Sequence, residues 1–219
     1  MSDLPSSAQE IAVVDTAAHE RKAALGAYWT GSRLFVAVSA MAFGGGVFAY
    51  FYLRSLNGNG LWRAQGQHPS TFIAVPVLVL TLVGCVLYLV TTRRLLRGQS
   101  SGADWRVASA VTVVTLVLAA GIQLWGMRRL PFFPGSSGYA SVYVAVTPLF
   151  AVWLLIGAYW VETLLARTLR VPWVTAPVGE NVDSDEAIAF NGSLEGSRLF
   201  VGFLGLLVIV LYVLFSVLG

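Results

Sequence analysis

The sequence predicts an all-α membrane protein that folds as a bundle of five transmembrane helices. The chain of 219 residues is 57% hydrophobic and only 11% charged, with a mean hydropathy of +0.73. Soluble domains carry about 25% charged residues. The apolar residues also gather in five segments, each long enough for a hydrocarbon core that requires about 20 apolar residues. A surface this poor in charge is therefore expected to face lipid.

The chain begins with a polar leader, residues 1–31. Its Ala-rich part, Ala17–Tyr28, is predicted to form a short interfacial helix, and Trp29 follows where a belt of aromatic residues is expected. Residues 32–219 form the membrane domain. The first apolar segment, Ser32–Leu53, is helical because lipid offers no hydrogen-bond partner and backbone groups must pair within the segment.

Four more apolar segments follow, each able to cross about 30 Å at 1.5 Å per residue. Pro76 and Pro148 fall inside the second and the fourth, where we expect local kinks rather than helix ends. With approximate ends, these predicted helices are Thr71–Thr92, Trp105–Met127, Tyr139–Ala166 and Leu199–Leu218.

The basic residues predict the orientation, because cytoplasmic loops of membrane proteins are rich in Lys and Arg. Most of the 14 basic residues fall on the side of the amino terminus: Arg21, Lys22, Arg33, Arg93, Arg94, Arg97, Arg106, Arg167, Arg170 and Arg198. The other side has only Arg54, Arg63, Arg128 and Arg129. The amino terminus is thus predicted to be cytoplasmic and the carboxyl terminus periplasmic, in a multi-pass protein of the bacterial cytoplasmic (inner) membrane.

The longest predicted connection, residues 171–196, joins the fourth and fifth helices on the cytoplasmic side. Two interpretations of this connection stay open, a solvated loop and a docking surface for another subunit. It holds an acidic cluster, made of Glu180, Asp183, Asp185, Glu186 and Glu195.

The sequence lacks the residue types that redox chemistry requires. One cysteine, Cys85, cannot build a multi-thiolate metal site, and two histidines, His19 and His68, leave little for haem, copper or iron. We therefore predict no metal, no cofactor and no catalytic residue in this chain, which is not an enzyme by itself. The net charge of +3 is explained by topology anchors, so nucleic acid is not an expected partner.

Two polar residues within the apolar segments are candidates for a membrane function, because polar groups are costly in lipid. Glu162 is predicted near the cytoplasmic interface, either reaching water or serving in a proton relay. Gln123 lies near the periplasmic end of the third helix and is expected to form an interhelical hydrogen bond.

Small residues in the first helix predict a close helix contact. Gly44, Gly45 and Gly46 follow Ala40 and Ala42, so that small residues recur four positions apart. Such spacing lets another helix backbone approach closely. The contact is either inside this bundle or with a partner protein.

Three stretches resemble subunit III of the haem-copper (cytochrome c) oxidases. SSGYASVYVAVT at residues 136–147, followed by an apolar helix with Gly157, is similar to one of the family's helix starts. AFGGGVFAYFYLR at residues 42–54 is similar to one of its helix ends, and Leu199–Leu218, with Tyr212, fits its final helix. Five helices fit the short bacterial members, which lack the first helical pair of longer ones.

The chain departs from that pattern where the family is polar. The family's membrane glutamate falls near Ser39 and Ala40, and its two histidines fall on Phe150 and Trp153. Gly126 replaces the glutamate that follows the family's glutamine, here Gln123, and the polar run of the last helix is absent from residues 197–201. The resemblance therefore implies a divergent member that keeps the scaffold and loses the polar network.

The resemblance implies an accessory, non-catalytic subunit of a respiratory terminal oxidase. Such a chain stabilises the catalytic subunit I, which holds the haem and copper, contacts other oxidase subunits, and orders phospholipid between them. The residues expected at helix contacts or at the partner interface are Gly44, Gly45, Gly46 and Gly157. The alternatives are an accessory subunit of nitric oxide reductase, a small transporter that acts alone, and a membrane-bound assembly factor.

Overall fold

The computed structural model describes residues 6–57, 62–64, 66–67, 70–171 and 185–218. In that part of the chain the regular structure is helical, and five helices are long and apolar enough to cross a membrane. The prediction of an all-α, multi-pass membrane protein is confirmed. The elements are α1 (Ser6–Leu56), α2 (Thr71–Leu96), α3 (Gly102–Met127), α4 (Gly138–Arg170), α5 (Asp185–Tyr212) and the π-helical η2 (Val213–Val217).

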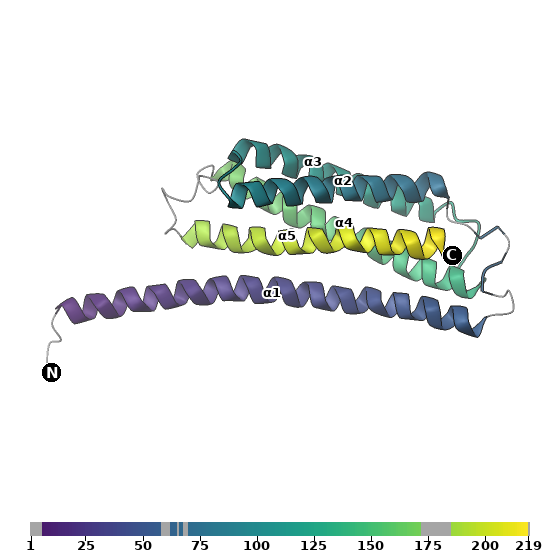
Figure 1. Ribbon diagram of the computed structural model, residues 1–219, viewed down its shortest axis with the longest axis horizontal. Coiled ribbons are helices and arrows are strands. Elements are labelled where there is room, and N and C mark those ends of the chain that lie inside the picture. The colour runs from purple at the N-terminus through teal and green to yellow at the C-terminus, as the bar shows by residue number, and fades with distance from the viewer. Residues whose placement is uncertain (1–5, 58–61, 65, 68–69, 172–184, 219) are drawn as a thin grey trace.

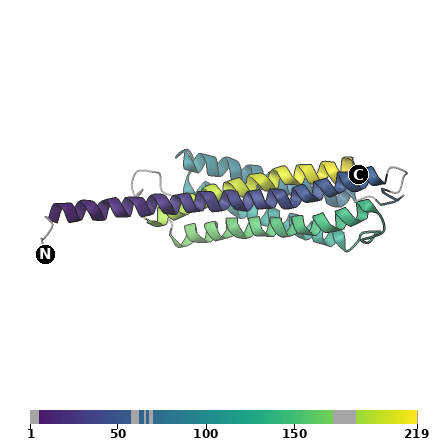
Figure 2. The ribbon, with the colours of Figure 1, turned by 90° about the horizontal axis from the view of Figure 1, so that it is seen from below.

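The helices lie nearly parallel, and α1 lies on one side of the bundle (Figures 1 and 2). Helices α2, α3 and α4 pack in sequence, and α5 packs against α2 and α4. Helix α1 packs mainly against α5 and α4, and its amino-terminal part extends well past the bundle. We call the end where α2 and α4 finish and α3 and α5 begin the arginine-rich end, and the other the opposite end.

The structure corrects the predicted boundary between the leader and the first membrane helix. Instead of a short separate helix over Ala17–Tyr28, one continuous helix of 51 residues runs from Ser6 to Leu56. Residues 6–56 contain no proline, and the Ala-rich stretch has a high helix propensity. Hydropathy shows where an apolar segment begins, but it does not show where the backbone stops being helical.

The predicted loop over residues 171–196 is also partly wrong, because α5 begins at Asp185. Glu195 therefore lies on a helix, whereas Glu180 and Asp183 of the acidic cluster lie outside the described residues. Further along α5, a Cβ atom on Gly196 would lie 2.9 Å from Ser32 of α1. The part of α5 that the sequence analysis placed in a loop therefore packs closely against α1.

Local signals fix the other helix ends. Ser101 caps α3 in a capping box with Asp104, and the Ser137 side chain accepts a hydrogen bond from the Ala140 N–H at the start of α4. Gly98, with φ of +66°, makes the turn after α2. Pro76 and Pro148 lie inside α2 and α4, as the sequence predicts.

Close contacts in the membrane interior depend on small residues and hydroxyl groups. At Gly84 a Cβ atom would collide with the Thr115 hydroxyl oxygen, so α2 and α3 approach closely at this glycine. The Thr112 hydroxyl donates to the Gly84 carbonyl, 3.1 Å away. Because lipid is as apolar as leucine, such packing and hydrogen bonds, rather than burial from water, hold membrane helices together.

Candidate functional site

The four glycines predicted at helix contacts divide into two pairs. A Cβ atom on Gly46 would lie 2.8 Å from Val146 of α4, and one on Gly157 would lie 2.6 Å from Leu204 of α5. These two glycines are contacts within the bundle. Gly44 and Gly45 are exposed, and within the described part of the chain no side chain or other helix comes within 4 Å of their Cβ positions. They face outward from α1.

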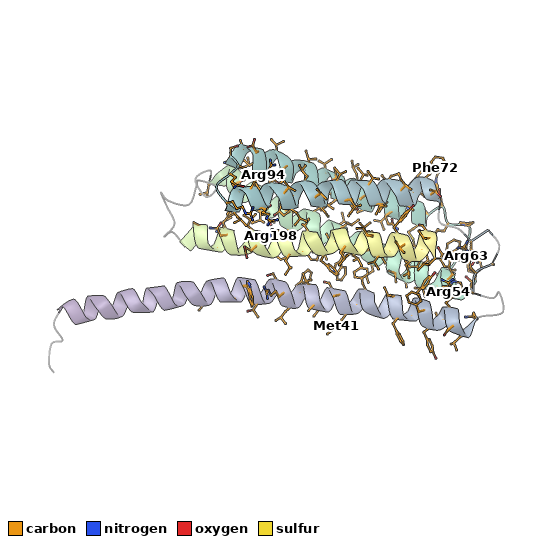
Figure 3. All side chains as sticks on the ribbon, viewed as in Figure 1. Met41, Arg54, Arg63, Phe72, Arg94 and Arg198 are labelled. Carbon is orange, nitrogen blue, oxygen red and sulfur yellow. The ribbon has the colours of Figure 1, made fainter. Side chains whose placement is uncertain are left out.

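The outward face of α1 is strongly apolar around these two glycines. Met41 is 77% exposed and Phe48 is 70% exposed, and Figure 3 shows Met41 pointing away from the other helices. Of the five membrane spans, that of α1 has the smallest buried share. A partner helix could therefore approach the α1 backbone closely at Gly44 and Gly45.

The structure places the two polar candidates in different surroundings. Glu162 is exposed on α4, eight residues before the helix ends at the arginine-rich end. Its side chain faces away from the bundle, and the choice between reaching water and serving in a proton relay stays open. Gln123 is half-buried near the opposite end and lines a half-open pocket with residues of α2, α4, α5 and η2. The structure therefore does not bring these two residues together.

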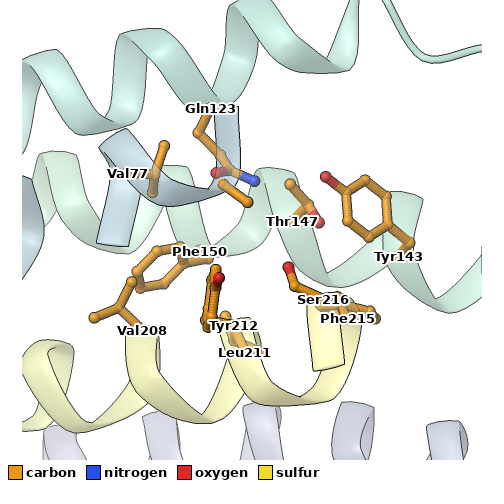
Figure 4. Close-up of a pocket in the computed structure, with 11 residues that line it drawn as sticks. Val77, Gln123, Tyr143, Thr147, Phe150, Val208, Leu211, Tyr212, Phe215 and Ser216 are labelled. Carbon is orange, nitrogen blue, oxygen red and sulfur yellow. The ribbon is translucent and has the colours of Figure 1, made fainter. Parts of the chain in front are cut away.

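The pocket at Gln123, which we call the glutamine pocket, has a volume of about 50 Å³. One wall is polar and carries the side chains of Gln123, Tyr143, Thr147, Tyr212 and Ser216, and Figure 4 shows their polar atoms around a common space. The remaining wall is apolar: Ala74, Val77, Phe150, Val208, Leu211 and Phe215. Sequence reasoning singled out Gln123 but missed the hydroxyl groups around it.

The positions where the resembled family is polar contain two linked hydrogen bonds and a group of aromatic rings. The Trp153 indole N–H donates to the Ser39 hydroxyl at 2.9 Å, and that hydroxyl donates to the Phe35 carbonyl at 2.7 Å. The Phe43 ring meets both Phe150 and Trp153 edge-on. These residues join α1 to α4 in the middle of the membrane span and provide no group that titrates at neutral pH.

A groove of about 430 Å³ lies at the arginine-rich end, between α1, α5 and the end of α2. We call it the arginine groove, and it is lined by Trp29, Ser32, Arg33, Leu96, Asn191, Gly192, Glu195, Gly196, Arg198 and Leu199. The Arg33 guanidinium lies 3.5 Å from the centre of the Trp29 ring. Among the described residues, neither Arg33 nor Arg198 forms an ion pair with a carboxylate.

The arginine groove lies at the level where lipid headgroups are expected. Trp29 is the first residue of the α1 span, Leu96 is the last of the α2 span, and Asn191 is near the start of the α5 span. Figure 3 shows Arg94 and Arg198 at this same end of the bundle. A more apolar groove of about 370 Å³, between α1, α4 and α5, is lined by Ala27, Gly31, Ser32, Phe35, Trp160, Gly192 and Ser193.

Further interhelical hydrogen bonds could not be predicted from the sequence. The Tyr88 and Ser197 hydroxyls are 2.7 Å apart in the buried contact between α2 and α5. The Trp105 N–H donates to the Thr92 hydroxyl at 3.1 Å, and Arg54 donates to the Leu218 carbonyl at 2.8 Å. Each pair joins an aromatic or basic donor to a residue far along the chain, or across a turn, without any sequence motif.

The described residues include no group of three or more His, Cys, Asp and Glu residues that could hold a metal ion. Cys85 is a free thiol, buried in the core. The described part of the chain presents two grooves at the arginine-rich end and one pocket at the opposite end. No family model matches the chain, and no curated protein is significantly similar to it.

Proposed function

We propose that this chain is an accessory, non-catalytic subunit of a respiratory haem-copper oxidase in the bacterial cytoplasmic membrane. It packs against the catalytic subunit, which holds the haem and copper, and stabilises that subunit within the lipid. The outward face of α1 carries this proposal. It combines two exposed glycines, Gly44 and Gly45, with large exposed side chains such as Met41 and Phe48. Of these residues, all but Met41 fall within one of the stretches that resemble subunit III.

The interior of the bundle supports a scaffold role. Ser39 and Trp153, at positions where the resembled family is polar, are joined by a hydrogen bond across α1 and α4. Phe150 is 2% exposed and packs edge-on against Phe43. Aromatic packing of this kind fixes the angle and distance between helices, which is what a subunit that supports a neighbour requires.

The test is copurification of the tagged full-length chain in a mild detergent. We expect a haem-bearing partner, identified by a pyridine haem spectrum, with copper in the same fraction. Gly45→Leu should reduce the recovered haem at least tenfold, because the leucine side chain holds the partner helix away. Recovery of the wild-type chain alone, without haem, would contradict the proposal.

Gly121→Leu provides the matched control. Gly121 lies on α3, is exposed, and has no neighbouring atom within 4 Å of its Cβ position, as at Gly45. The Gly121→Leu variant should leave the amount of recovered haem unchanged. An equal loss of haem in Gly45→Leu and Gly121→Leu would point to general misfolding. The copper content also separates the oxidase from the alternative of a nitric oxide reductase complex.

We further propose that the arginine groove binds the phosphate group of an anionic phospholipid as part of this role. Arg33 and Arg198 line the groove without carboxylate partners among the described residues, whereas Glu195 supplies a single negative charge. Arginine binds phosphate through charge-assisted hydrogen bonds, and the groove adjoins the apolar spans that would contact the acyl chains.

Native mass spectrometry of the chain from mixed phosphatidylglycerol and phosphatidylcholine micelles tests the lipid site. We expect phosphatidylglycerol adducts to fall at least fivefold in the double variant Arg33→Gln, Arg198→Gln. Arg128→Gln, an exposed arginine at the opposite end, should have no effect. Equal adducts from the two lipids, or retention of adducts in the double variant, would contradict the site.

A further inference from the structure

The glutamine pocket is a polar site inside the membrane span that the proposed function does not use. Gln123 is four residues from the end of α3, and Tyr143 is five residues from the start of α4. At 1.5 Å per residue, both lie about 6–8 Å along their helices from the opposite end. The pocket therefore lies inside the apolar spans but close to their end, near the expected boundary between the apolar layer and the headgroup region.

These polar groups are incompletely satisfied by the protein. A glutamine amide has two N–H donors and a carbonyl acceptor, and among the described residues Gln123 has no hydrogen-bond partner. The same is true of the Tyr212 and Ser216 hydroxyls, whereas the Tyr143 hydroxyl interacts with Thr147. These side chains therefore have donors and acceptors left over for small polar ligands in the pocket.

The size of the pocket selects what can fill this space. A water molecule requires about 10–15 Å³ of cavity measured with a water-sized probe, so about 50 Å³ holds a few waters and no drug-sized ligand. Water also needs two to four polar partners, and five side chains here provide them from α3, α4, α5 and η2. Apolar cavities stay dry, but this one has a polar wall.

The π-helical turn contributes directly to the site. In η2 the Leu218 N–H bonds the Val213 carbonyl, five residues earlier, and this wider turn includes Ser216. Ser216 is exposed at the rim of the pocket, while Phe215 is buried and forms part of its apolar wall. The carboxyl-terminal turn thus brings a hydroxyl group to the space facing Gln123 (Figure 4).

We infer that the glutamine pocket binds a small cluster of water molecules, held by the Gln123 amide and the surrounding hydroxyls. The waters complete the hydrogen bonds of α3, α4 and the carboxyl-terminal turn and join these elements at the opposite end of the bundle. Gln123 is the central anchor, because its amide offers two N–H donors and a carbonyl acceptor, whereas each hydroxyl offers a single donor.

Radiolytic hydroxyl-radical labelling of the full chain in lipid nanodiscs tests this inference, because radicals formed from bound water modify adjacent side chains. Tyr143 is the reporter, since it is only 7% exposed yet lines the pocket. Tyr88 is the matched control, a fully buried tyrosine whose hydroxyl bonds Ser197. We expect Tyr143 to be labelled at least fivefold faster than Tyr88, and equal rates would overturn the inference.

Two variants test the anchor. Gln123→Leu should lower the labelling rate of Tyr143 at least threefold, because the amide that holds the waters is lost. Ser216→Ala, which removes only an exposed hydroxyl, should lower the labelling rate of Tyr143 about twofold. This second variant tests the inference if Gln123→Leu does not fold. Unchanged labelling of Tyr143 in a folded Gln123→Leu or Ser216→Ala protein would show that the cluster does not depend on these side chains.

Discussion

At the scale of single residues, hydrogen bonds from aromatic side chains to hydroxyl groups join helices that hydropathy treats as uniform. The Ser39 hydroxyl receives the Trp153 N–H, while Ser193 receives the Trp160 N–H. Each bond satisfies a polar indole group that lipid and neighbouring apolar side chains leave without a partner. These pairs identify which faces of two helices meet, and that information is absent from the apolar character of the segments.

Ser39→Ala should destabilise the protein by about 1–2 kcal/mol, because it leaves the Trp153 N–H without its acceptor in a half-buried site. Thermal unfolding in detergent, followed by tryptophan fluorescence, measures the loss. The control is Ser55→Ala on the same helix, whose hydroxyl is exposed and bonds only the nearby Tyr52 carbonyl. Equal midpoints for the two variants would contradict a role for this bond.

At the scale of helices, the contact between α2 and α3 depends on the absence of a side chain at Gly84. A Cβ atom there would meet the Thr115 hydroxyl, and the Thr112 hydroxyl already bonds the Gly84 carbonyl. Threonine is stiff about χ1, so the crowding at Thr115 is not relieved by a flexible side-chain end. The two helices must separate to accept any larger residue.

Gly84→Ala should therefore destabilise the chain by about 1–3 kcal/mol, as overpacking does in a well-packed interior. Gly121→Ala, at an open position on α3, should instead be neutral or stabilising by up to about 1 kcal/mol, since alanine favours the helix. Denaturation in mixed micelles compares the two variants, and the opposite order of stability would show that the α2–α3 contact is not close at Gly84.

At the scale of the whole molecule, the described arginines divide between the two ends of the bundle. Arg94 and Arg198 lie at the arginine-rich end, and Arg54 and Arg63 lie at the opposite end (Figure 3). The larger basic group belongs in the cytoplasm by the positive-inside rule. The orientation stays a prediction, and the connections at the two ends provide positions at which to test it.

Thiol labelling in intact cells tests the orientation with little background, because Cys85 is only 1% exposed. Gln99→Cys, after α2, should react with a membrane-impermeant maleimide only after lysis. Phe133→Cys, at a side chain that is 72% exposed between α3 and α4, should react in intact cells. The reverse pattern would place the amino terminus outside.

The sequence alone predicted the fold class well. Crossing a membrane requires an apolar segment of about 20 residues, and the length and mean hydropathy of such a segment can be read directly from the sequence. It predicted neither the single long α1 nor the start of α5 at Asp185. Helix formation continues beyond the apolar layer wherever the local propensity allows, and hydropathy does not register that continuation.

The candidate sites were predictable only in part. Gln123 could be identified because a polar amide within an apolar segment needs a partner, yet its neighbours Tyr143 and Ser216 come from other helices. Their assembly depends on the rotation and register of the helices. Similarly, the glycine run predicted a packing face, but only the packed structure shows that Gly46 faces inward while Gly45 faces outward.

The length of α1 gives the molecule a mechanical property. The 51 residues form a rod of about 76 Å, of which about 35 Å precedes Trp29 and extends past the bundle. By geometry alone, rotating a straight helix of this length by about 10° about Trp29 would displace its first residue by about 6 Å.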